Sequence, residues 1–156
     1  MTAAASRLVC AGCGARPGPL EPFPFRCSQA LSGDDVDHVL RRELDLAAVR
    51  FPTDDPEPNP FIRYRTFLHA YHVALRGGLS DSDFCSLVQE LDRRVETVDG
   101  HGFTATPFAR SVELSDRLGF SNGGGVWVKD ETRNVSGSHK ARHLFGLLLF
   151  DEVERI

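Results

Sequence analysis

Residues 126–155 read VWVKDETRNVSGSHKARHLFGLLLFDEVER. The first part, Val126 to Lys129, is short, rich in β-branched and aromatic residues, and predicts a strand. A polar loop follows from residue 130 to residue 138, and from about His139 the apolar residues run through Val153 at helical spacing. Strand, polar loop and helix in this order predict an α/β unit. Phe145 and Leu149 face away from Leu144 and Leu148, so this helix needs cover on more than one side.

The most informative residue of this stretch is a lysine in the first turn of the predicted helix. The helix dipole disfavours a cation there by a few tenths to about 1 kcal/mol. Lys140 nevertheless has His139 and Arg142 beside it. These basic groups, free backbone N–H groups and the hydroxyls of Ser136 and Ser138 suit a bound phosphate. The nucleotide-binding phosphate loop does not fit, because the Gly-Lys-Ser/Thr ending is missing. A helix N-terminus and nearby cations also favour a neutral amine, the nucleophile that attacks an aldehyde.

The segments Lys129-Asp-Glu131 and 134–142 (NVSGSHKAR) resemble the lysine loop of fold-type II pyridoxal-phosphate (PLP) enzymes, K-x-E-x-x-N-P-T-G-S-F-K-x-R. That group includes threonine synthase, the serine/threonine dehydratases and the tryptophan synthase β-subunit. The sequence departs from the pattern at Val135, Ser136 and His139. Further upstream, residues 61–64 (FIRY) and the run that starts with residues 106–108 (TPF) are similar to segments of threonine synthase, in the same order.

The resemblance implies the N-terminal part of a tryptophan synthase β-like α/β fold, truncated here. It implies that Lys140 holds the cofactor as a Schiff base. Ser138 and His139 are then phosphate contacts, with helix capping as an equally weighted alternative. The implied activity is a PLP-dependent lyase of the threonine synthase type, which acts by elimination on a hydroxy amino acid or its phosphate ester. The partner is then a small amino-acid substrate, and the full-length form is a homodimer.

Two alternatives remain open at this point. The first is an ammonia-lyase of the serine/threonine dehydratase type. The second, from another class, is a non-catalytic fragment or small binding protein, because the family's remaining cofactor and substrate loops follow the lysine and the chain ends at Ile156.

Upstream of the lysine loop, the sequence suggests three segments. Residues 1–31 contain Cys10, Cys13 and Cys27 and resemble an incomplete zinc ribbon. Residues 32–60 predict a helix over 35–49 followed by a proline-rich linker. Residues 61–156 are the predicted start of the catalytic domain. A closed structural zinc site needs four ligands. The spacing selects neither His38 nor Asp34 as the fourth, which favours a metal-free module.

Charge and hydropathy narrow the class of protein. A net charge of -4 and a pI of about 5.8 argue against nucleic acid as a partner. The longest apolar stretch, residues 144–150, is too short to cross a bilayer. Residues 1–10 contain no apolar core of secretory length, so the prediction is a cytoplasmic protein with reduced thiols.

Overall fold

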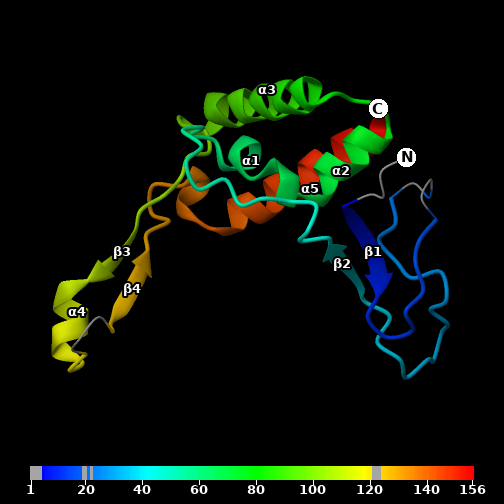
Figure 1. Cartoon of the computed structure of the whole chain (residues 1–156), viewed down its shortest axis with the longest axis horizontal. Helices are drawn as coiled ribbons and strands as arrows, with labels where there is room; N and C mark the ends of the chain where they lie inside the picture. The colour runs from blue at the N-terminus through cyan, green and yellow to red at the C-terminus, as the bar shows by residue number, and fades with distance from the viewer. Residues whose placement is uncertain (1–4, 19–20, 22, 121–123) are drawn as a thin grey trace.

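The computed structural model describes residues 5–18, 21, 23–120 and 124–156. Within these ranges the chain is a mixed α/β structure with two separate two-stranded antiparallel sheets and five α-helices. Helices α1, α2, α3 and α5 lie in the middle, the β1–β2 sheet lies at one end, and the β3–β4 sheet with α4 projects from the other (Figure 1).

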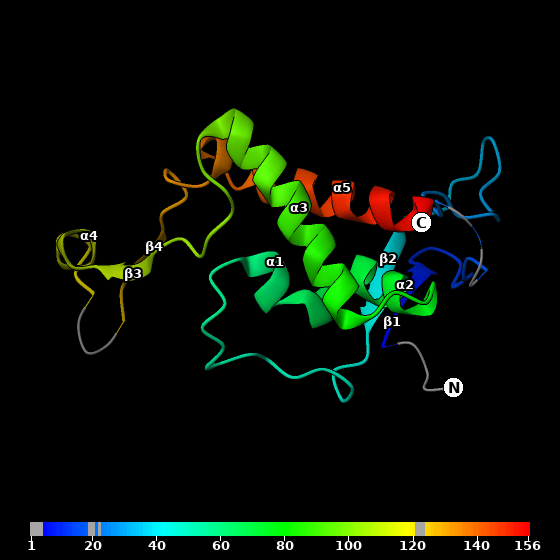
Figure 2. The same cartoon turned by 90° about the horizontal axis from the view of Figure 1, so that it is seen from above.

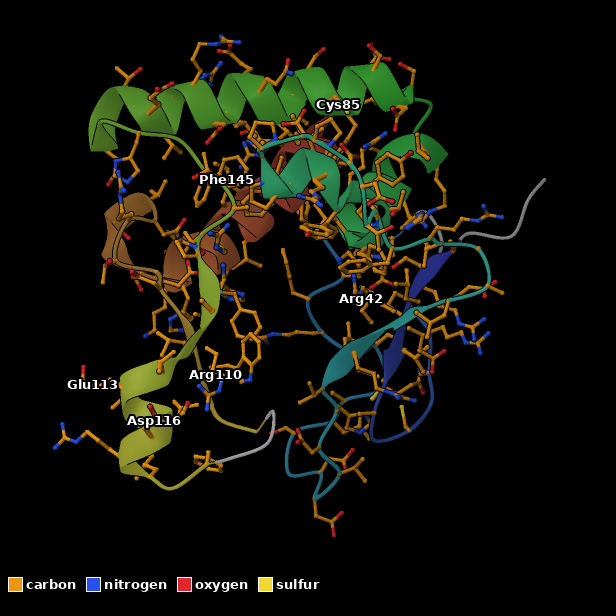
Figure 3. The ribbon with its side chains drawn as sticks, turned by 60° about the vertical axis from the view of Figure 1, so that its left-hand side comes forward. Arg42, Cys85, Arg110, Glu113, Asp116 and Phe145 are labelled. Carbon is orange, nitrogen blue, oxygen red and sulfur yellow. The ribbon has the colours of Figure 1, made fainter. Side chains whose placement is uncertain are left out.

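The helices enclose the main hydrophobic core. Helices α1 (Pro60–Arg63), α2 (His69–Arg76) and α5 (Lys140–Arg155) meet α3 (Asp81–Asp99), and a 3-10 turn, Arg65–Phe67, joins α1 to α2. Phe145 of α5 points into this core (Figure 3), with its ring 4.6 Å from that of Phe61 and 4.7 Å from that of Phe103. The predicted two-sided character of α5 is confirmed, because Leu149 is fully buried whereas Leu144 is 63% exposed.

Helix α3 is bounded by local signals that are visible in the sequence. The Ser80 side chain accepts the Asp83 backbone N–H, and Asp83 accepts that of Ser80, which forms a capping box. Gly100 ends the helix in the left-handed conformation with φ 89°. The sequence also predicts this helix, because its apolar residues recur at helical spacing between Ser80 and Gly100, and the structure confirms it. From its middle, Asp92 accepts hydrogen bonds from the Asn59 amide and the Phe103 N–H, both at 2.8 Å, and so joins two loops to α3.

The N-terminal unit differs from the predicted one. Strand β1 (Ser6–Cys10) pairs with β2 (Leu40–Leu44) in antiparallel register, from Ser6 opposite Leu44 to Cys10 opposite Leu40. The helix predicted over residues 35–49 is wrong, because β2 occupies its centre. Strands β1 and β2, which pair in one sheet, lie on either side of the predicted boundary at residue 31.

The second sheet stands away from the helices as a ribbon (Figure 2). Strand β3 (Phe108–Ser111) pairs with β4 (Val126–Lys129), and α4 (Val112–Arg117) lies between them in the chain. The predicted strand over residues 126–129 is confirmed. Residues 111–118, followed by Gly119, also predict a short helix from the sequence, and α4 confirms it. The ribbon is sparsely covered, since Phe108 is 63% exposed and Trp127 is 54% exposed.

No helix among the described residues is long and apolar enough to cross a membrane. Residues 1–4 of the N-terminal stretch used in the export prediction lie outside the described residues.

Candidate functional site

Lys140 is the first residue of α5, directly after the polar loop. Its side chain is exposed, and its amine has neither a hydrogen bond nor an ion pair with any described residue. The sequence contains only one other lysine, Lys129, beside sixteen arginines. Lys129, at the end of β4, donates to the carbonyl and hydroxyl oxygens of Thr106 and lies 3.6 Å from Glu131. One lysine of the pair is therefore engaged and the other is free to react.

A charged network holds the base of the loop. The Arg142 Nε atom lies 3.1 Å from Glu131, and the Thr106 hydroxyl donates to the same carboxylate at 2.6 Å. Burial opposes ionisation of Glu131, but hydrogen bonds from Thr106 and Arg142 hold its pKa below the usual value. Arg142 also donates to the Thr104 carbonyl at 3.0 Å. The Arg142 guanidinium is committed to this network, and its contacts are those of a residue that supports the loop.

The loop itself is shaped by specific backbone contacts. The Asn134 amide donates to the Ser138 carbonyl at 2.7 Å, and the Ser136 N–H donates to Asp99 of α3 at 3.0 Å. Ser136 adopts φ 54°, in the left-handed region, and Gly137 follows with φ 59°. Asn134 is buried, and its Oδ1 has no hydrogen-bond partner among the described residues. The loop is ordered by groups other than Lys140, and these groups fix where α5 begins.

Ser138 and His139 differ in what they contact. The Ser138 hydroxyl oxygen accepts the Lys140 N–H at 3.2 Å, which is a capping contact. His139 is exposed and its ring contacts no polar group of the described residues. The backbone N–H groups of Ala141 and Arg142 are bonded to the carbonyls of Ser138 and His139. Of the two side chains, that of Ser138 is bonded to the helix start and that of His139 has no polar partner among the described residues.

Lys140 lies on open surface. A largely apolar cavity of about 310 Å³ lies beside α5. It is lined by residues that include Leu8, Phe25 and Leu149, and the α5 residues among them lie further along the helix than Lys140. Lys140 does not line this cavity.

A second group of reactive side chains gathers at the end of β1. The ligand atoms of Cys10, Cys13, Cys27 and His38, here called the Cys3His cluster, all lie within 4.8 Å of one another. The sequence pattern identified the three cysteines but did not select His38, which the structure places beside them. The only feature of the sequence that pointed to His38 was Asp34, four residues before it. The Asp34 carboxylate lies 2.7 Å from the His38 Nε2.

The groups of the cluster have pKa values shifted in different directions. Burial works against ionisation of Cys10, but hydrogen bonds from Cys13, Gly12 and His38 lower its pKa to about 6. The Asp34 carboxylate raises the pKa of His38 to about 9. The Gln29 N–H lowers the pKa of Cys27, yet burial and the neighbouring thiols raise it overall. All four cysteines of the chain, including Cys85 on α3, are free thiols.

Comparison with known proteins found no matching family model, no matching curated protein and no matching solved structure.

Proposed function

We propose that this chain carries the cofactor lysine, Lys140, of a PLP-dependent lyase of the threonine synthase type, which acts by elimination on a hydroxy amino acid or its phosphate ester. One observation supports this assignment most directly. The Lys129–Glu131–Arg142–Thr106 network and the Asn134 contact hold the loop, while the Lys140 amine at its end has no partner among the described residues.

The residues present fit the cofactor in two respects. The free amine of Lys140 is suited to covalent attachment of an aldehyde, and the Ser138 hydroxyl and the His139 ring are placed for contact with a phosphate. The buried, unpaired Oδ1 of Asn134 is an acceptor that a bound group or water would satisfy. Bound PLP supplies an electron sink for charge that develops at the substrate α-carbon. The Lys140 amine would then be the base that takes the α-proton.

The test uses the full chain and the cofactor itself. PLP is added, the adduct is fixed with borohydride, and the modified residues are mapped by mass spectrometry. We expect Lys140 to be modified well ahead of Lys129 and the N-terminal amine. Because simple exposure would also favour Lys140, the same reaction is run with pyridoxal, which lacks the phosphate. We expect PLP to modify Lys140 faster than pyridoxal does, and inorganic phosphate to slow PLP only.

Matched variants complete the experiment. Lys129→Arg keeps the network charge and should leave the Lys140 adduct unchanged, whereas His139→Ala should reduce the preference for PLP over pyridoxal. Equal rates of modification by PLP and pyridoxal at Lys140 would show an exposed amine without a phosphate site, and would refute the proposal.

A further inference from the structure

We infer that the Cys3His cluster is a structural zinc centre, with Cys10, Cys13, Cys27 and His38 as its four ligands and Asp34 as the residue that orients the histidine. This inference is independent of the proposed PLP chemistry, because it rests on residues 10–38 alone.

Two distances within the cluster match those expected between ligands of a tetrahedral zinc site. With Zn–S bonds of about 2.3 Å and a Zn–N bond of about 2.0–2.1 Å, a tetrahedron separates two sulfurs by about 3.8 Å and a sulfur from the nitrogen by about 3.6 Å. The Cys13 and Cys27 sulfurs are 3.6 Å apart, and the Cys10 sulfur is 3.5 Å from the His38 Nδ1. A disulfide needs about 2.05 Å between sulfurs. The observed distances are therefore those of ligands arranged around a common centre.

The backbone around the first two cysteines is folded as a tight knuckle. The Cys10 carbonyl accepts the Gly14 N–H at 3.0 Å, and Gly14 has φ 74°, which a side chain would disfavour. The N–H groups of Gly12 and Cys13 point to the Cys10 sulfur. Such donors stabilise a thiolate, which is the form that binds metal.

His38 is brought to this knuckle by close contact between chain segments. The Ala11 N–H donates to the Val39 carbonyl at 2.8 Å, next to His38. A Cβ atom on Gly12 would lie 2.5 Å from the Asp37 carbonyl oxygen, so only glycine permits this approach. Asp34 accepts the Val36 N–H at 2.9 Å with one carboxylate oxygen and contacts the His38 Nε2 with the other. This carboxylate–histidine arrangement leaves Nδ1 as the metal-binding atom.

The donor set selects the metal and its role. Three thiolates and one imidazole suit zinc, whereas calcium and magnesium prefer oxygen ligands and common iron–sulfur clusters take four thiolates or pairs of cysteines and histidines. Four protein ligands close the coordination shell, which is typical of structural rather than catalytic zinc. The segment that carries the cluster also needs such a centre for its stability. Among the described residues, the main core cluster includes no residue before Phe61.

The experiment measures metal in the full chain purified under reducing conditions without added chelator. We expect about one zinc per chain by elemental analysis, and replacement by cobalt should give the visible bands of a tetrahedral thiolate complex. Cys13→Ser and His38→Ala should lose zinc, whereas Cys85→Ser, outside the cluster, should keep it. Because those variants could also unfold the unit, Asp34→Asn and His38→Cys are added. The first should weaken zinc binding about 10–100-fold, and the second should retain a full ligand set.

Substoichiometric zinc, a different metal, or full zinc retention by both Cys13→Ser and His38→Ala would overturn the inference. None of these results depends on Lys140, so failure here is distinguishable from failure of the PLP proposal.

Discussion

The β1–β2 sheet and the β3–β4 sheet each consist of two short antiparallel strands, and neither contributes a residue to the main core cluster. Isolated two-stranded sheets are at best marginally stable in water. At one end, β1 buries Ser6, Val9 and Cys10, and its neighbours converge on the Cys3His cluster. At the other end, the strands of the ribbon contain no buried residue and rest on the Glu131 network. A small sheet far from the core can thus be held by a centre of ligands or by a network of charges.

Attachment to the helices also differs between the two sheets. Ser6 hydrogen-bonds to His69 of α2 at 2.9 Å, and its carbonyl accepts from Arg76 at 3.2 Å. Arg42 of β2 extends toward the helices (Figure 3) and donates to the Phe67 carbonyl. The outer part of the ribbon makes its polar contacts within itself, as when Arg110 donates to the Gly124 carbonyl at 2.9 Å. The N-terminal sheet is therefore docked on the helical core, and the ribbon is anchored only at its base.

The largest expected effect comes from removing the carboxylate at the base of the ribbon. Glu131→Ala leaves Arg142, Lys129 and Thr106 without their shared acceptor and should cost about 2–3 kcal/mol of unfolding free energy. The matched change in the other sheet is Glu43→Ala, whose partners Arg7 and Arg41 are largely exposed, and it should cost less than about 1 kcal/mol. Urea unfolding measures both. Equal losses would show that the two sheets do not differ in this way.

A smaller effect should follow from crowding the knuckle. Gly12→Ala places a Cβ atom 2.5 Å from the Asp37 carbonyl oxygen and should cost about 1–3 kcal/mol of unfolding free energy. Gly146→Ala, in the middle of α5 with no atom within 4 Å of the added Cβ, should instead stabilise by about 0.5–1 kcal/mol. Thermal unfolding in the presence of zinc compares the two. A neutral Gly12→Ala would contradict the close approach of the two segments.

The docking of β1 on α2 should depend on pH through His69. Burial, together with Arg76 and Arg42, lowers the pKa of His69 to about 4. In the unfolded chain the pKa of histidine is about 6.5, so between these values the unfolded state binds the extra proton and stability falls as pH decreases. Urea midpoints from pH 7 to pH 4 should show a smaller slope for His69→Gln than for the unchanged protein. An unchanged slope for His69→Gln would count against this assignment.

The smallest effect concerns the aromatic pair on the ribbon. The rings of Phe108 and Trp127 lie 5.5 Å apart on exposed strands. Their coupling in a double-mutant cycle with alanine should be about 0.2–1 kcal/mol. A larger coupling would mean that contacts within the ribbon stabilise it more than the Glu131 network at its base does.

Local signals in the sequence were sufficient for several elements. Ser80 and Gly100 marked the ends of α3, Ser111 marked the start of α4, and Lys140 was correctly placed in the first turn of α5. These features depend on residues within about one turn of each other, so the sequence around them contains the necessary information. The second apolar face of α5, which is exposed in the structure, could likewise be predicted from the helical spacing of nearby residues.

The tertiary structure alone decided the arrangement of the N-terminal unit. The apolar spacing over residues 35–49 predicted a helix, but pairing of β2 with β1 across a long loop prevailed, because partner strands supply hydrogen bonds that no local pattern records. His38 joined the three cysteines for a similar reason, since its place depends on β2 and on the gap left at Gly12. Likewise, the sequence could place Arg142 beside Lys140, but only the folded loop turned its guanidinium to Glu131 and left the lysine amine free.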